Sequence, residues 1–137
     1  MERDEISYRE ILDNLYDAVY FVDRDRRITY WNKGAEELTG YAGGEVIGRC
    51  CSDNILNHID ENGVNICTTA CPLLKTVEDG ERREVEYLLK HKNGHRLPVS
   101  IRVSPVRNES GEITGAVEIF SDNSKQKSYE TQLKGLR

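Results

Sequence analysis

The chain has no long hydrophobic run. Nothing in its 137 residues approaches the roughly 18 consecutive apolar residues of a membrane-spanning helix, so we expect no direct membrane insertion by this segment. The opening residues, MERDEISYRE, are charged and lack the apolar stretch of a secretory signal. We therefore expect a cytoplasmic protein, in a compartment where thiols stay reduced.

The chain also lacks the motifs of common enzymes and nucleic-acid binders. It contains no glycine-rich phosphate loop, no GxSxG elbow and no HExxH helix. Its 19 basic and 24 acidic residues give a net charge of −5, with no basic run interleaved with aromatic residues. The sequence therefore predicts a non-catalytic domain with no nucleic-acid partner. A Cys51 nucleophile with His58 as its base is the enzymatic alternative.

Cysteine is confined to one stretch of the chain. All four cysteines lie in GRCCSDNILNHIDENGVNICTTACPLL, together with one of the three histidines. They are Cys50, Cys51, Cys67 and Cys71, and the histidine is His58. Ten of the 18 residues between them are Ser, Asp, Glu, Asn or Thr, so these cysteines do not extend an apolar stripe.

The first half of the chain alternates short strands and helices. Apolar residues at helical spacing predict an amphipathic helix over residues 4–16. They are Tyr8, Ile11, Leu12 and Leu15. Two β-rich runs, Ala18–Val22 and Ile28–Trp31, flank a polar turn and predict a hairpin. The stretch NKGAEELTGY predicts a short helix with Asn32 as its N-cap and Gly40 at its end.

Two more helical segments are predicted before the second half of the domain. One is a single turn around Glu45–Ile47. In the other, TTACPLLKTVEDG, Thr69 or Cys71 caps the helix, Pro72 sits in its first turn and Gly80 closes it.

From residue 83 onward the apolar period is two. The stretch EVEYLLKHKNGHRLPVSIRVSPV predicts two strands joined at Asn93-Gly94, a strong hairpin signal. One face of each strand is apolar, and these faces comprise Val85, Tyr87 and Leu89, then Leu97, Val99, Ile101 and Val103. ITGAVEIFSD predicts a last strand, and SKQKSYETQLKGLR returns to helical spacing. Antiparallel strands with helices between the second and third of them indicate an α+β fold.

The same order of elements resembles a PAS domain, the sensory box of bacterial signalling proteins. Four stretches carry the resemblance: AVYFVDRDRRITYWNKGAEELTGY, EVIGR, KHKNGHRLPVSIRVSPV and GAVEIFSDNSKQK. The resemblance implies a five-stranded antiparallel sheet in the order 2-1-5-4-3, with short helices on one face and flanking helices at both ends. It divides the chain into an N-terminal amphipathic helix (1–16), the PAS domain (17–123) and the start of a C-terminal signalling helix (124–137), cut at Arg137.

The resemblance also implies a function. PAS domains sense a small ligand, a metal or a redox state in a pocket between sheet and helices. They dimerise through flanking helices and control a linked output such as a histidine kinase of a two-component system or a diguanylate cyclase. Asp122 and Ser124 stand where the family carries the pair that joins the last strand to the outgoing helix, and both can cap that helix. The alternative is a ligand-free PAS dimerisation module.

The cysteine stretch is open to four interpretations. The thiols can fill the core, with His58 on the surface. They can bind zinc or an iron–sulfur cluster through Cys51, His58, Cys67 and Cys71, with Cys50 as a substitute for Cys51. A third interpretation is a thiol switch, in which Cys50 or Cys51 pairs with Cys67 or Cys71. In the fourth, GRCC resembles the start of the flavin-adduct motif of LOV photoreceptors.

Flavin and haem both fit poorly with the residues around the cysteines. After GRCC the chain reads Ser52-Asp53-Asn54-Ile55 where LOV domains carry Arg-Phe-Leu-Gln, and the later strands lack the flavin-holding Asn and Gln. There is no Cys-x-x-Cys-His for covalent haem. In haem-binding PAS domains the proximal histidine lies on the helix before the third strand. Here that helix reads ACPLLKTVEDG and contains no histidine. His91 and His95 flank the Asn93-Gly94 turn, where we expect them to be exposed.

Overall fold

The computed structural model describes residues 10–12, 17–50, 55–69 and 71–135. Its strands are β1 (Ala18–Asp23), β2 (Ile28–Trp31), β3 (Arg83–Lys90), β4 (Arg96–Arg107) and β5 (Ile113–Asp122). Its helices are α2 (Lys33–Thr39), α3 (Gly43–Val46), α4 (Ile66–Thr69), α5 (Pro72–Asp79) and α6 (Ser124–Gly135). Of the helix predicted over residues 4–16, only 10–12 fall in the described ranges, and these three residues are helical.

One sheet organises the fold. Its strand order is β2-β1-β5-β4-β3 and each neighbouring pair is antiparallel, as predicted. β1 and β5 lie side by side at its centre, where Ala18 pairs with Phe120 and Asp23 with Gly115. A Cβ on Gly115 would lie 2.0 Å from the carbonyl oxygen of Val22, so only glycine permits this close pairing.

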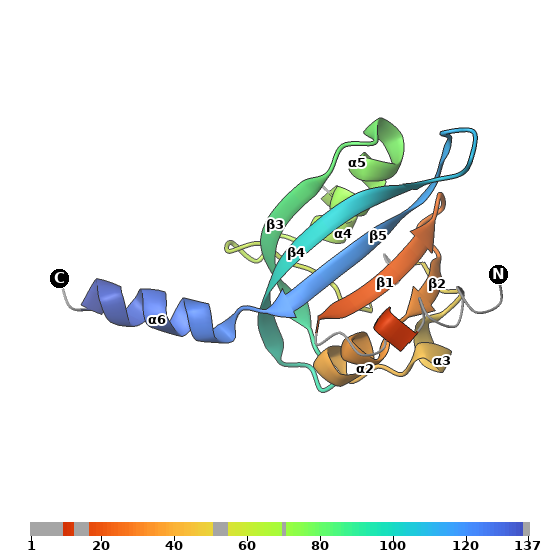
Figure 1. Cartoon of the computed structure of the whole chain (residues 1–137). Coiled ribbons are helices and arrows are strands. Elements are labelled where there is room, and N and C mark those ends of the chain that lie inside the picture. Colours follow the sequence, from red (N-terminus) through yellow and green to blue (C-terminus); the bar gives the residue numbers. More distant parts are fainter. Residues whose placement is uncertain (1–9, 13–16, 51–54, 70, 136–137) are drawn as a thin grey trace.

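The helices α2 to α5 lie on one face of this sheet (Figure 1). Asn32 fixes the first of them, because its buried Oδ1 accepts from the backbone N–H of Ala35 at 2.8 Å and of Val19 at 2.9 Å. One side chain thus caps α2 and ties it to β1. Gly40 ends α2 with φ +81°, which confirms the predicted C-cap.

The helix predicted in TTACPLLKTVEDG is α5, and a separate short helix, α4, precedes it. α4 ends at Thr69, and α5 begins at Pro72 with Cys71 at its N-cap position. The side chain of Cys71 makes no capping hydrogen bond, so the prediction is right for the position and wrong for the bond. Gly80 closes α5 with φ +73°, as predicted.

The core fills the space between the sheet and these helices. Alternate residues of each strand point into it, including Val99, Ile101 and Val103 of β4. Tyr20 of β1 packs edge-on against Phe120 of β5, with ring centroids 6.0 Å apart. The period-two patterns of the sequence therefore identified the buried face of the sheet correctly.

At the end of β5 the chain leaves this compact body. α6 projects away from the sheet (Figure 1), and Tyr129 and Leu133 on it are each 62% exposed. Within the described residues, no helix is long and apolar enough to cross a membrane.

Candidate functional site

An interior cavity of about 20 Å³ lies between the inner face of the sheet and the segment that leads through α4 into α5. Its lining is largely apolar but includes every described cysteine except Cys50, together with a histidine, a carboxylic acid and two tyrosines. The lining residues are Tyr20, Leu56, His58, Ile66, Cys67, Cys71, Pro72, Leu73, Tyr87, Ile101 and Glu118. A volume near 20 Å³ holds about one water-sized group.

Cys67 and Cys71 reach this cavity from α4 and from the start of α5. Both are thiols in the structure, and Cys71 is buried. Burial raises the pKa of Cys67 to about 11, although a hydrogen bond from the backbone of His58 opposes the shift. Cys67 is therefore a neutral thiol at neutral pH and not a reactive thiolate. The two thiols come from separate helices, because Cys67 lies in α4 and Cys71 at the N-cap position of α5.

His58 is only 8% exposed, so the expectation that it lies on the surface under the core-filling interpretation is wrong. The next residue, Ile59, holds it in place by pairing with Leu88 of β3, through two backbone hydrogen bonds of 2.9 Å. Burial, with Arg96 nearby, lowers the pKa of His58 to about 4, so the imidazole is neutral. Its Nε2 has no hydrogen-bond partner among the described residues.

Glu118 is the residue of this site that the sequence analysis missed. It lies on β5 between Ala116 and Phe120, all three on the buried face of the strand, and it is 2% exposed. Burial raises its pKa to about 8, against a hydrogen bond from Tyr20 that favours the charged form. Its Oε2 lacks a partner within the described ranges. The alternation of ITGAVEIFSD was the available signal, because it places an acid on a core face.

The structure brings together three of the four predicted metal ligands: His58, Cys67 and Cys71 line one cavity. Cys51, the fourth, lies outside the described residues. Cys50, the suggested substitute, is not at the cavity; its Sγ lies 3.7 Å from the carbonyl oxygen of Asp25, to which it donates. As the described side chains stand, no three His, Cys, Asp or Glu are grouped closely enough to hold a metal ion.

The two residues predicted to join β5 to α6 are in contact. The carboxylate of Asp122 accepts from the backbone N–H of Ser124 at 2.8 Å, at the first residue of α6. Between them Asn123, which the sequence analysis did not single out, is 5% exposed. Its backbone N–H donates to Pro98 of β4 at 2.8 Å, and its side chain donates to Glu86 of β3 at 2.6 Å. The junction between β5 and α6 is thus held by hydrogen bonds to β3 and β4 as well as by β5 itself.

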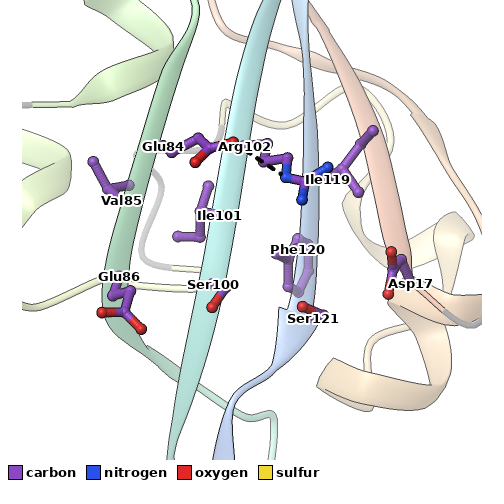
Figure 2. Close-up of a pocket in the computed structure, with 10 residues that line it drawn as sticks. All are labelled: Asp17, Glu84, Val85, Glu86, Ser100, Ile101, Arg102, Ile119, Phe120 and Ser121. Carbon is purple, nitrogen blue, oxygen red and sulfur yellow. Dashed lines mark ion pairs between the residues drawn. The ribbon is translucent and has the colours of Figure 1, made fainter. Parts of the chain in front are cut away.

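A second, larger hollow of about 510 Å³ lies on the opposite face of the sheet. Figure 2 shows Glu86, Ser100 and Ser121 in a row across β3, β4 and β5, and an ion pair between Glu84 and Arg102. Oε1 of Glu84 and Nε of Arg102 are 3.4 Å apart. None of the described cysteines or histidines lines this hollow.

The sheet order, with helices over one face, is the fold that the resemblance to sensory domains implied. A family model of the PAS domain matches residues 17–125, and the chain belongs to the PAS domain family. It is 30% identical over 125 residues to the signal transduction histidine-protein kinase AtoS of Escherichia coli, covering 89% of this chain and 18% of that protein.

Two further similarities are consistent with this family. A human high-affinity cAMP-specific 3',5'-cyclic phosphodiesterase 8A is 29% identical over 109 residues, which are 80% of this chain and 12% of that enzyme. The crystal structure of a PAS domain from Colwellia psychrerythraea superposes with a TM-score of 0.71 at 27% identity, covering 87% of this chain and 96% of the other. The chain thus spans less than a fifth of each of the two curated relatives, which are 18% and 12% covered.

Proposed function

We propose that this chain is the sensory input domain of a longer signalling protein, and that its input binds in the interior cavity. Binding there changes the position of β5, and the change passes through Asp122 and Ser124 to α6 and on to a linked output domain. The kinase relative supports a histidine kinase as the parent, with a diguanylate cyclase as the other output considered. The proposal places the protein in the cytoplasm as a homodimer, with no catalytic role for this domain.

A single observation carries the proposal: two buried polar atoms face one cavity and have no partner in the described residues. They are Nε2 of His58, in the segment before α4, and Oε2 of Glu118, on β5. More than about nine in ten buried polar groups in folded proteins are hydrogen-bonded, and an orphaned one costs roughly 1–3 kcal/mol. Two such atoms at one small cavity therefore favour a bound molecule or ion as their partner.

The position of Glu118 supports the route of the signal. It is on β5, the strand that ends at Asp122 and leads directly into α6. Asn123 fastens the same junction to β3 and β4. A ligand that draws on Glu118 therefore acts on a strand whose far end holds the outgoing helix.

Three inputs suit the cavity lining. A metal ion fits thiols and imidazole, with zinc ahead of an iron–sulfur cluster at Cys51, His58, Cys67 and Cys71. Thiol oxidation fits a redox sensor, and a small polar molecule fits the two orphaned atoms. Flavin is left out, since a cavity of about 20 Å³ would have to expand many-fold to admit it.

The ligand-free dimerisation module is the second candidate, and the small size of the cavity favours it. In that case a buried water satisfies His58 and Glu118, and the exposed Tyr129 and Leu133 of α6 supply the interface.

Hydrogen exchange distinguishes the two candidates. The chain is purified without oxygen or chelator, and one half is stripped of bound molecules by unfolding and refolding. Native mass spectrometry then compares each half with the 15.7 kDa expected from the sequence. We expect added mass in the first half, and slower exchange of β5 and α6 amides than in the stripped half. Equal masses and identical exchange would contradict a sensory cavity and leave the dimerisation module.

A further inference from the structure

We infer that the interior cavity is a site for one thiophilic divalent ion, of which Zn²⁺ is the probe, with Cys67, Cys71, His58 and Glu118 as its ligands. The inference rests on the proposed function, because it names the input of the same cavity. What is new is Glu118: it adds a carboxylate from the sheet to a set of ligands from the helical wall.

The donor set is chemically suited to such an ion. Zn²⁺ in proteins is bound by four ligands drawn from thiolates, imidazole nitrogen and carboxylate oxygen. The cavity lining offers two thiols, one imidazole and one carboxyl group, from four separate places in the chain. Apart from two tyrosines, the remaining described lining is apolar, so among the described residues these four are the strong ligands that line the cavity.

The two orphaned atoms are both atoms that ligate metals. Nε2 of His58 and Oε2 of Glu118 are buried at the cavity with no hydrogen-bond partner in the described part of the chain. An imidazole Nε2 and a carboxylate oxygen need no donor when they share a cation, so one ion satisfies both. The hydrogen bond from Tyr20 to Glu118 then orients the carboxylate, as outer-shell partners of metal ligands do.

The cavity volume selects a single ion over a cluster. About 20 Å³ accommodates one water-sized group, which is room enough for a lone Zn²⁺. An iron–sulfur cluster has several metal and sulfide atoms and would not fit without rebuilding the wall. Local charge is compatible as well: on binding, the two thiols and the carboxyl group release their protons to solvent, and the resulting two thiolates and one carboxylate exceed the ion's charge by one. The guanidinium of Arg26, which donates to the carbonyl oxygen of Cys67 at 3.4 Å, supplies a compensating positive charge.

The arrangement also implies movement on binding. The described ligand residues are not yet grouped tightly enough for an ion, so at least one wall must close to form the site. The ligands lie on both walls: Cys67 and Cys71 on the helical side, and Glu118 on β5. Closure around the ion therefore draws β5 toward α4 and α5, which is the displacement that the proposed signal requires.

The direct test is a titration of the stripped, reduced chain with Co²⁺ and then with competing Zn²⁺. Tetrahedral Co²⁺ bound by thiolates absorbs in the visible range and has a sulfur-to-metal charge-transfer band. We expect one ion per chain, with a thiolate band that Zn²⁺ abolishes. This reading needs no variant, so it does not depend on whether a variant folds. A spectrum without the thiolate band would overturn the inference.

Matched variants assign the ligands. Cys67→Ser, Cys71→Ser, His58→Asn and Glu118→Gln should each weaken Zn²⁺ binding by at least about tenfold. Cys50→Ser, His95→Asn and Glu84→Gln make the same changes outside the cavity and should leave the affinity unchanged. If the cysteine variants lose binding and Glu118→Gln does not, the fourth ligand is another residue and the assignment of Glu118 fails. Circular dichroism of the metal-free variants checks their folding, with Cys71→Ala as the substitute if Cys71→Ser unfolds.

Hydrogen exchange in the presence of Zn²⁺ separates this inference from the proposed function. If Zn²⁺ binds and α6 exchange stays unchanged, the metal site stands and the proposed signalling route fails. If Zn²⁺ does not bind but native mass spectrometry finds another molecule that protects β5 and α6, the sensory function stands and the metal site fails.

Discussion

The two faces of the sheet carry similar residues in opposite chemical states. Glu84 on the outer face is exposed and pairs with Arg102 across a gap of 3.4 Å. Glu118 on the inner face is buried, and its pKa is raised to about 8. The larger hollow is on the outer face and the smaller on the inner face, at about 510 and 20 Å³. Burial and unsatisfied polar atoms, more than volume, are therefore the reasons to propose the inner cavity as the functional site.

The largest expected difference between the faces is in packing. Ile101 on β4 is 2% exposed, whereas Ile119 on β5 lies on the outer face beside Arg102. Ile101→Ala should lower the free energy of unfolding by about 2–5 kcal/mol, because it leaves a cavity in the core. Ile119→Ala should cost roughly 1 kcal/mol. Urea denaturation followed by circular dichroism measures both. Equal losses would mean that the outer face is covered by another surface in solution.

The pH dependence of stability sharpens the contrast. Glu118 keeps its proton in the folded state up to about pH 8 but loses it near 4.5 when unfolded. The folded state therefore binds more protons in between, and stability falls as the pH rises. His58 acts oppositely, but only between its folded-state pKa of about 4 and the ordinary histidine pKa of 6.5. Tyr20 and Cys71 are the titratable groups that face Glu118, and Cys67 nearby, with a pKa of about 11, stays protonated in the folded state throughout this range.

Between pH 6.5 and 8 nothing opposes the destabilisation that comes from the raised pKa of Glu118. The metal-free chain should therefore lose about 2 kcal/mol of stability over this range. Urea melts in the presence of chelator at several pH values measure the slope. Glu118→Gln should flatten it, whereas Glu84→Gln on the outer face should leave it as it is. A slope that survives Glu118→Gln would show that Glu118 ionises normally in the folded state.

The exit from the sheet is where the two faces meet. Asn123 is buried, yet its side chain reaches Glu86 on the outer edge of β3 at 2.6 Å. Asn123→Ala should cost about 1–2 kcal/mol, because it removes a hydrogen bond to a charged group. Exchange of α6 amides should also quicken, measured by hydrogen exchange. Glu86→Gln, which retains an acceptor oxygen, should lose less; an equal loss would mean that the charge and not the bond matters.

The fold could be predicted from the sequence because its signals are local. Period-two alternation in β3 to β5 and the caps Asn32, Gly40 and Gly80 each depend on a few neighbouring residues. The site could be predicted only in part. Cys67 and Cys71 drew attention by composition, but the burial of His58 depends on its loop pairing with β3, some 30 residues away in sequence. Such a contact leaves no local pattern.

Glu118 was within reach of the sequence and was still missed. It occupies the core-facing register of β5, and an acid in that register is costly unless something compensates it. Two departures from the ordinary pattern of a core can be compared here as signs of a site. A polar residue on an apolar face is a stronger sign of a site than a cluster of cysteines, because the cysteines also have an ordinary role as small core residues.

The smallest expected effect is on the outer face. Glu84 and Arg102 have side chains 78% and 74% exposed, so water and salt screen their attraction. A double-mutant cycle with Glu84→Gln and Arg102→Gln should give a coupling below about 0.5 kcal/mol, reduced further at high salt. The matched cycle on the inner face uses Glu118→Gln and Tyr20→Phe, and we expect a coupling of roughly 1–3 kcal/mol, insensitive to salt. If the two cycles gave the same value, burial would not be what separates the two faces, and Glu118 would lose its claim to a special role.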